Sequence, residues 1–331
     1  MFRFTCARSK TTVPWRLSLV ALSITGLFGA AVAQEPTPAA TAQEPTPPAE
    51  AISLLGQPLY PPSLPPSRKH ALETELAEAR AAYEQNPDDP ERIIWLGRRT
   101  AYLGRYREAI QIYTDGINKH PNDARLYRHR GHRYITVRQL SNAIADLEKA
   151  VTLIRGQADQ IEPDGQPNKY NVPTTTLHFN IWYHLGLAYY LTGDFRNALR
   201  CYRQCMKVSR WNDDALCATS HWLYMTYRRL GRVNEAAAVL KPIRQRMTIL
   251  ENHTYHQLLL MYKGQITPER LWASVKEDDL DAATVGYGIG NWHFYNGRPT
   301  QARAFFRQVI ERPNWAAFGF IAAEAELARS K

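Results

Sequence analysis

The 331-residue sequence has few of the patterns that carry catalysis or bind cofactors. It contains no Gly-x-Ser-x-Gly nucleophile elbow, no His-Glu-x-x-His zinc motif and no phosphate-binding loop. Only four cysteines occur, and none lies in the Cys-x-x-Cys-His arrangement that attaches haem. These gaps disfavour the motif-bearing hydrolases and cofactor enzymes, so we expect a protein that is not an enzyme and carries no cofactor.

The sequence also lacks an apolar run long enough to cross a bilayer. The apolar run near its start, residues 17–29, is 13 residues long, whereas a spanning helix needs about 20. Four basic residues and no acidic one accompany this run, and the small residues Ala31-Val32-Ala33 follow it. That order is typical of a cleavable signal peptide. We therefore expect residues 1–33 to export a bacterial protein to the periplasm or the medium, with no membrane span after cleavage.

Proline and threonine are concentrated in one segment after this signal. The motif Ala-Gln-Glu-Pro-Thr-Pro occurs twice here, beginning at Ala33 and at Ala42, and the rest of residues 34–67 is rich in proline through Pro66. Such a composition favours an extended chain without a packed core. The sequence thus predicts a disordered tether over residues 34–67, followed by a folded domain over residues 68–331.

The folded domain contains a recurring triplet of small residues. Gly97 is followed by Gly104 and Ala109, and a step of 34 residues leads from Gly97 to Gly131. This is the period of a unit of two helices that stacks with its neighbours into a solenoid. We expect the first glycine to let the two helices approach with the alanine facing it, and the second to end the first helix. The triplet recurs at Gly186, Gly193 and Ala198, and at Gly290, Gly297 and Ala302.

One unit, residues 179–212, carries the fullest pattern. Trp182, Leu185, Gly186 and Tyr189 are followed by an alanine and a tyrosine in the second helix. This resembles the tetratricopeptide repeat (TPR) family, whose signature is Trp-x-x-Leu-Gly-x-x-Tyr, and the resemblance covers roughly residues 70 to 329. It implies an all-α, tetratricopeptide-like helical-hairpin solenoid of about five to six units with capping helices.

Departures from the period mark the irregular parts of the solenoid. An insertion over residues 155–178 contains the turn Pro163-Asp164-Gly165. A unit without the glycine landmarks is expected as two helices, His253–Tyr262 and Pro268–Val275. Further helices over residues 68–85 and 315–329 are expected to cap the ends. The insertion lies where it can close over one edge of the concave face that such a solenoid forms.

In the resembled family, three positions of each first helix line a concave groove that binds peptides. Arginine and aromatic side chains at such positions suit an acidic or C-terminal peptide segment, because a guanidinium holds a carboxylate with two hydrogen bonds. The alternative is a solvated face whose charges pair with neighbouring carboxylates. The asparagine-containing carboxylate clamp of the family is not matched, which disfavours a chaperone-tail ligand. The predicted groove residues are Arg98, Tyr102, Arg125, Arg128, His132, Tyr183 and His221.

Two histidine pairs and three cysteines need separate interpretation. His129-x-x-His132 and His253-x-x-His256 each offer two metal ligands without a third at a typical spacing, so we expect no metal site. Cys205 lies at the small-residue position of a second helix and Cys217 begins the next unit. In an oxidising compartment these two form a candidate disulfide that leaves Cys201 free, and small apolar packing residues are the equal alternative.

Charge and fold together predict an adaptor of the cell envelope. The formal net charge of +10 becomes +6 without the four basic residues of the signal. In an exported protein this modest excess points to acidic groups of the envelope, or to solubility alone, before nucleic acid. We therefore expect a scaffold that binds a protein or peptide partner. Two other classes stay open: an envelope enzyme or enzyme subunit acting on glycan, with convergent carboxylates in a deep pocket, and a structural component that self-assembles.

Overall fold

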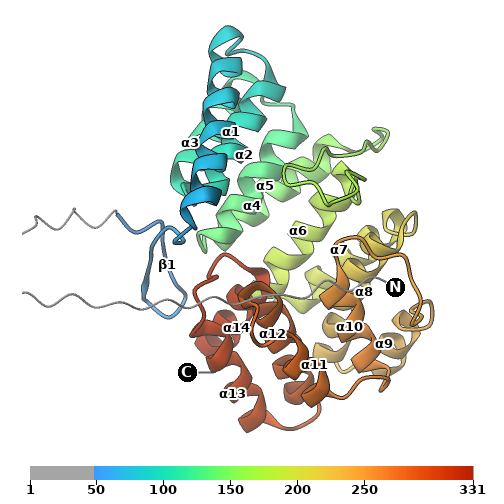
Figure 1. Cartoon of the computed structure of the whole chain (residues 1–331). Coiled ribbons are helices and arrows are strands. Elements are labelled where there is room, and N and C mark those ends of the chain that lie inside the picture. Colours follow the sequence, from blue (N-terminus) through green and yellow to red (C-terminus); the bar gives the residue numbers. More distant parts are fainter. Residues whose placement is uncertain (1–47, 331) are drawn as a thin grey trace, which may run out of the picture. The chain divides into compact units, whose positions relative to one another are not determined.

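The structure is a computed structural model and describes residues 48–330. Over these residues the chain forms fourteen helices and one two-stranded hairpin (Figure 1). The all-α fold class predicted from the sequence is therefore confirmed. The predicted signal peptide and residues 34–47 of the predicted tether lie outside the described residues.

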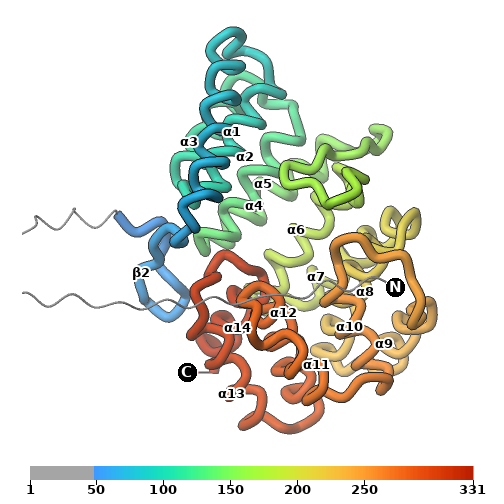
Figure 2. The backbone as a smooth tube through the Cα atoms, in the orientation of Figure 1, coloured from blue at the N-terminus to red at the C-terminus, as the bar shows by residue number. Residues whose placement is uncertain are grey.

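Successive helices pair into hairpins, which the backbone tube in Figure 2 follows from blue to red. Helix α1 (Pro66–Gln85) precedes the first hairpin and α14 (Phe318–Arg329) follows the last. The six hairpins are α2 (Pro90–Tyr102) with α3 (Tyr106–Lys119), α4 (Ala124–Thr136) with α5 (Leu140–Leu153), α6 (Leu177–Thr192) with α7 (Phe195–Val208), α8 (Asp213–Arg229) with α9 (Val233–Val239), α10 (His253–Tyr262) with α11 (Pro268–Val275), and α12 (Asp279–Tyr295) with α13 (Pro299–Ile310).

Local sequence signals explain where these helices begin and end. Asp89 caps α2 by accepting the backbone N–H of Glu91, and Pro90 occupies the first turn, where its missing N–H is not needed. Gly193 ends α6 with φ of 86°, as expected for the second glycine of the triplet. In the second hairpin the equivalent position is Arg138, which adopts φ of 65° without being glycine.

The first glycine of each triplet is covered by a larger side chain than the one we expected. A methyl group added at Gly186 would lie 2.8 Å from the ring of Tyr202, and one at Gly290 would lie 2.6 Å from Phe306. Both rings come from the residue four positions after the alanine of the triplet. The glycine therefore makes room for a ring of the second helix that follows the alanine by one turn.

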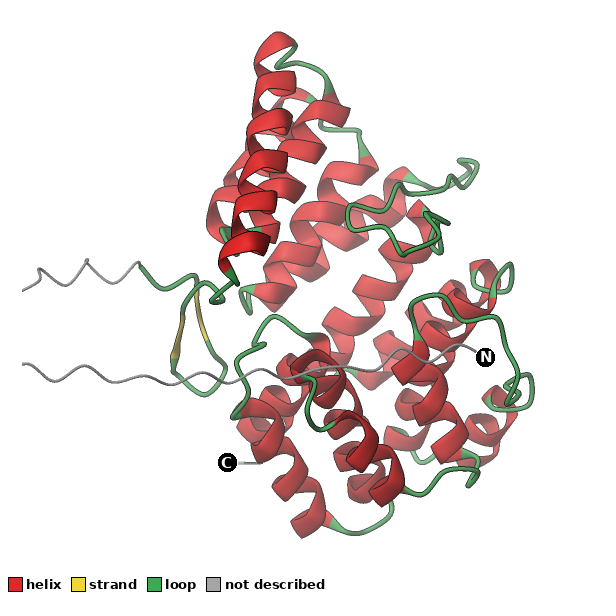
Figure 3. Cartoon of the chain, in the orientation of Figure 1, coloured by secondary structure: helices red, strands yellow, loops and turns green. Residues whose placement is uncertain are grey.

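Part of the predicted tether is ordered. Strands β1 (Ala51–Ile52) and β2 (Pro58–Leu59) pair antiparallel and are drawn in yellow in Figure 3. Ala51 is buried, and the backbone N–H of Leu54 donates to a carboxylate oxygen of Glu324 in α14. The tether prediction is thus corrected for residues 48–65: proline keeps this segment extended, but its apolar residues and backbone groups find partners on the helices.

Helix α14 is more than a one-sided cap. Residues 319–326 are all buried, and the helix packs against α12, α13 and α6. Glu324 forms an ion pair with Arg138, whose Nη2 lies 2.7 Å from Oε2. This helix therefore ties the end of the chain back to the second and third hairpins. No helix among residues 48–330 combines the length and apolar character that a membrane crossing requires.

Candidate protein-interaction sites

The insertion covers the part of the predicted groove that lies on the first two hairpins. Glu162 Oε1 lies 2.9 Å from Arg128 Nη2, and Arg98 Nη1 donates to the carbonyl of Pro163 at 2.8 Å. Gly165, in the same turn, lies directly against the hydroxyl of Tyr102. Arg98 and Arg128 are buried as a result. An acidic segment of the chain itself therefore occupies the place that we predicted for a partner.

The electrostatics of this covered site follow from burial next to several cations. Burial lowers the pKa of Arg128 although Glu162 opposes the shift. Burial, followed by the charge of Arg128, lowers the pKa of His129 well below its usual value. Nε of Arg128 and Oε2 of Glu162 are buried without a hydrogen-bond partner among the described residues. The pair His129 and His132 belongs to no cluster of three or more potential metal ligands within residues 48–330.

The other half of the predicted groove is filled by α10 and α14. His132 has its ring centroid 4.4 Å from that of His184 and 5.4 Å from that of Phe318 at the start of α14. The hydroxyl of Tyr183 accepts a hydrogen bond from Trp222 Nε1 at 2.7 Å and donates one toward Tyr255 of α10 at 3.2 Å. These contacts bury Tyr183 and leave His132 only partly exposed.

His221 and Arg125 are also engaged within the fold. The ring of His221 stacks on Tyr255 with centroids 4.7 Å apart. Arg125 pairs with Glu91 at 2.7 Å and with Asp123 at 2.6 Å, which is the charged-face alternative considered above. None of the seven predicted groove residues is fully exposed. The expectation of one open groove lined by all seven is therefore corrected: the insertion, α10 and α14 cover most of the others, whereas Arg125 lines a separate pocket of about 550 Å³.

The candidate disulfide is not formed in the structure. Cys201, Cys205 and Cys217 are all buried free thiols. Cys205 Sγ lies 3.2 Å from Thr219 Oγ1, and burial raises its pKa to about 12. Cys205 therefore packs as a small core residue against α8, since its sulfur is directed at the threonine hydroxyl and not at Cys217.

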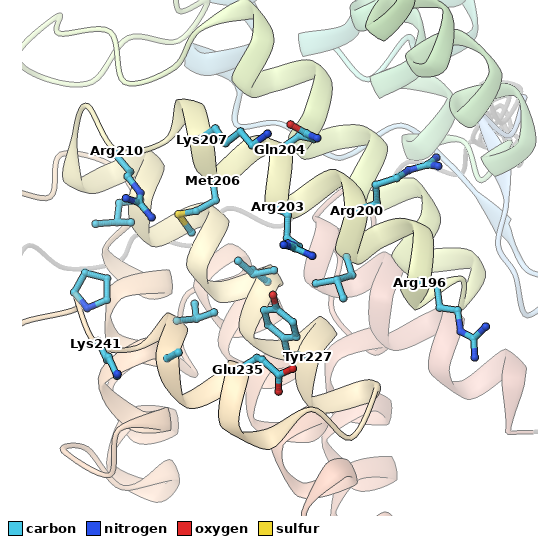
Figure 4. A pocket seen from close by; sticks show the side chains of 16 residues that line it. Arg196, Arg200, Arg203, Gln204, Met206, Lys207, Arg210, Tyr227, Glu235 and Lys241 are labelled. Atoms are coloured by element: carbon cyan, nitrogen blue, oxygen red, sulfur yellow. The ribbon is translucent and has the colours of Figure 1, made fainter.

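A groove that the sequence analysis did not identify lies between α7, α8 and α9 and has a volume of about 1570 Å³ (Figure 4). Its floor is apolar and combines Leu199 and Met206 of α7 with Leu216 and Leu223 of α8. Glu235 is the one carboxylate among the described residues that line it. The cations around it are Arg196, Arg200, Arg203, Lys207, Arg210 and Lys241.

The groove exists because the second helix of this hairpin is short. Helix α9 has seven residues, whereas α3, α5 and α7 have 14 each. Pro242 follows closely, and proline disfavours helix in the residue before it and offers no N–H of its own. Buried Asp214 then accepts the backbone N–H groups of Leu250, Glu251 and Asn252. The chain after α9 is thereby held at the start of α8, and the groove stays uncovered.

The basic residues of α7 are free of internal partners. Arg196, Arg200, Arg203 and Lys207 of α7, and Arg210 two residues beyond its end, are all exposed, and within residues 48–330 none makes an ion pair or a side-chain hydrogen bond. Figure 4 shows Arg203 reaching from α7 toward Tyr227 of α8. Like charges this close are favourable only when an anionic group is near. The groove is therefore a basic-edged, apolar-floored surface suited to an acidic ligand.

A sequence signal for this groove was present. The four α7 cations follow one another at intervals of four, three and four residues, which places them along one helix face, and Arg210 follows two residues after the helix ends. In the repeat pattern the peptide-binding positions lie on the first helix of each unit, whereas α7 is a second helix. The shortness of α9, marked by Pro242, was the second signal.

These hairpins and the groove define a helical-repeat scaffold for protein–protein interaction. The tetratricopeptide repeat family model matches residues 179–210, which cover most of the α6–α7 hairpin, and residues 285–314, which cover α13 and the second part of α12. The chain therefore contains tetratricopeptide repeats.

Several solved structures are similar to the chain. A tetratricopeptide repeat protein from Parabacteroides merdae is 15% identical, covers 78% of this chain and 94% of its own, and has a TM-score of 0.45. YrrB, described as a TPR protein with an unusual peptide-binding site, is 15% identical, covers 75% and 97%, and has a TM-score of 0.39. The protein MamA is 15% identical, covers 61% and 89%, and has a TM-score of 0.39. No curated protein matches the sequence.

Proposed function

We propose that this protein is an adaptor that binds an acidic segment of a protein partner in the groove between α7, α8 and α9. The observation that carries the proposal is the set of exposed α7 cations, unpaired within the described residues, beside an apolar floor. Cations on such an edge attract and orient an acidic segment, while the floor supplies the apolar area that stabilises the complex. A single carboxylate in the lining does not favour the glycan-acting alternative, which needs at least two.

The partner is proposed to reside in a bacterial cell envelope. The support is the signal-like order of residues 1–33, with basic residues, a short apolar run and a small-residue cleavage motif. Mass spectrometry of the protein recovered from the periplasm of an expressing cell should find Gln34 as the new N-terminus. Recovery of the uncleaved chain from the cytoplasm alone would contradict this location.

The binding proposal is tested with a synthetic acidic peptide and matched charge variants. The probe is a fluorescent peptide of 14 residues, the length of α7, that combines glutamate with leucine. Its affinity for the full chain is measured by anisotropy. Reversing Arg203 and Lys207 to Glu should weaken binding about 30-fold, since two attractions of about 0.5 kcal/mol each become repulsions of similar size, a change of about 2 kcal/mol. Added salt should weaken the wild-type complex, because exposed charges are screened.

The control reverses two arginines of the same spacing elsewhere. Arg303 and Arg307 lie four residues apart on α13, are exposed, and also make no ion pair within residues 48–330. The variant with both changed to Glu has the same net charge as the variant that carries Arg203→Glu and Lys207→Glu. Equal loss of affinity in both variants, or no binding of the acidic peptide at about 1 mM, would refute the proposed site.

A second candidate site is favoured by the internal ligand on the first two hairpins. Glu162 pairs with Arg128, and the carbonyl of Pro163 accepts a hydrogen bond from Arg98, as groups of an acidic partner segment would. We propose that such a segment displaces the insertion there. Replacing Glu162 by Ala in the variant that carries Arg203→Glu and Lys207→Glu should then restore affinity for the acidic peptide. Unchanged affinity would assign the insertion a purely structural role.

A further inference from the structure

The groove lies where the second half of a full-length helix is missing from the fourth hairpin. The second helices of the first three hairpins, α3, α5 and α7, each have 14 residues, but α9 ends after seven. The uncovered strip of α8 and the adjacent face of α7 therefore keep a shape that a helix normally fills. We infer that the occupant of this groove is an amphipathic α-helix of the partner, with an apolar face and an acidic edge. This inference rests on the proposed function.

The apolar floor has the spacing of two helical seams. Leu199 and Met206 are seven residues apart on α7, and Leu216 and Leu223 are seven apart on α8. Residues at that interval lie on one side of a helix, two turns apart. Two neighbouring helices that each present such a seam form a trough into which the side chains of a third helix pack. The floor therefore favours a helical partner over an extended one.

The basic edge distinguishes the two backbone types by distance. From Arg196 to Lys207 the four α7 cations cover 11 residue steps, or about 17 Å along the helix axis at 1.5 Å per residue. A helical partner with glutamates at the same four-three intervals repeats this spacing along its full length. In a strand, alternate residues are about 6.7 Å apart, so four successive acidic side chains would span about 20 Å and run out of step with the cations. Charge spacing thus points to a helix as well.

The experiment compares three peptides of equal composition on the full chain. The first has glutamates at four-three intervals beside a leucine face, with one proline at its first residue. The second has the same residues with the proline moved to the centre, where it breaks the helix. The third alternates leucine and glutamate, as a strand would. Affinities are measured by anisotropy, and the helix content of each peptide by circular dichroism with and without the protein.

The expected result is that the first peptide binds at least tenfold more tightly than the other two and gains helix content on binding. Reversal of Arg203 and Lys207 should remove this advantage, and reversal of Arg303 and Arg307 should leave it. Equal affinity of all three peptides at the groove would overturn the helix inference while the acidic-segment function stands. Absence of binding by all three would overturn both.

Discussion

The buried ion pair between Arg138 and Glu324 should be a main determinant of stability. Arg138 lies in the left-handed backbone region, which disfavours a residue with a side chain by about 1–2 kcal/mol. Its side chain is 2% exposed and that of Glu324 is 1% exposed, with Nη2 and Oε2 2.7 Å apart. Nη2 also donates to the carbonyl of Trp315, and the Glu324 carboxylate accepts from the backbone of Leu54. One pair thus joins the second hairpin, α14 and the β-hairpin segment.

Replacing Glu324 by Gln keeps the size of the side chain but leaves the Arg138 charge buried without a counterion. Loss of one partner of a buried pair costs about 3–5 kcal/mol. We expect about 3 kcal/mol for this variant, because Arg138 keeps hydrogen bonds to two backbone carbonyls, those of Thr136 and Trp315. The matched control is Glu73→Gln in the surface pair with Lys69, whose side chains are 43% and 61% exposed. An exposed pair contributes about 0–1 kcal/mol, so the control should stay near wild type.

The assay is urea unfolding of the full chain, followed by far-UV circular dichroism and by tryptophan fluorescence. Coincidence of the two curves is needed before a free energy is derived, because helical repeats can unfold in parts. The double variant Arg138→Met with Glu324→Leu removes both charges and should be more stable than Glu324→Gln alone. A loss below about 0.5 kcal/mol in Glu324→Gln, or a loss equal to that of Glu73→Gln, would refute the assigned role of the pair.

Three further predictions concern buried groups of the core. Burial lowers the pKa of His221 to about 3. Below about pH 6.5 the unfolded chain therefore binds a proton that the folded chain does not. The free energy of unfolding should fall by up to about 1.4 kcal/mol for each unit by which the pH is lowered. His221→Phe, which keeps a ring against Tyr255, should reduce that slope in urea titrations between about pH 7 and 4.5; an unchanged slope would contradict the assignment. Burial raises the pKa of Cys205 to about 12, so mass spectrometry should find it alkylated by iodoacetamide at about pH 8 only after denaturation, and labelling of the native chain there would contradict the packing. Gly186→Ala places a methyl group 2.8 Å from Tyr202 and should cost about 1–3 kcal/mol in urea unfolding; adding Tyr202→Leu should recover part of this loss, and full additivity of the two changes would speak against the contact.

Much of the helical architecture was predictable because its signals are local. Both helices of the least regular unit, His253–Tyr262 and Pro268–Val275, begin and end in the structure at the residues expected from the sequence. The second glycine of the triplet ends its helix in the left-handed conformation, as at Gly193. Caps, prolines and glycines act through neighbours a few residues away, so the chain reveals them without its tertiary contacts.

The candidate site could not be predicted to the same extent. Arg98 and Arg128 meet an acidic segment of the chain itself, but this insertion lies far along the sequence, and Arg98 and Pro163 are 65 positions apart. The α7 cations were visible as a stripe in the sequence, but their freedom from partners was not. Whether a charge faces solvent or a carboxylate depends on elements that the repeat pattern does not place.

The sequence by itself thus determined the helices, their pairing into hairpins and the 34-residue repeat, because backbone hydrogen bonds and helix caps join near neighbours. Only the tertiary structure decided which surface is open. Arg138 meets Glu324 across 186 positions, α14 packs on α6, and the chain after α9 is tied to Asp214. Such contacts depend on the accumulated geometry of several hairpins, and that geometry covers the predicted groove and leaves the basic groove of α7 exposed.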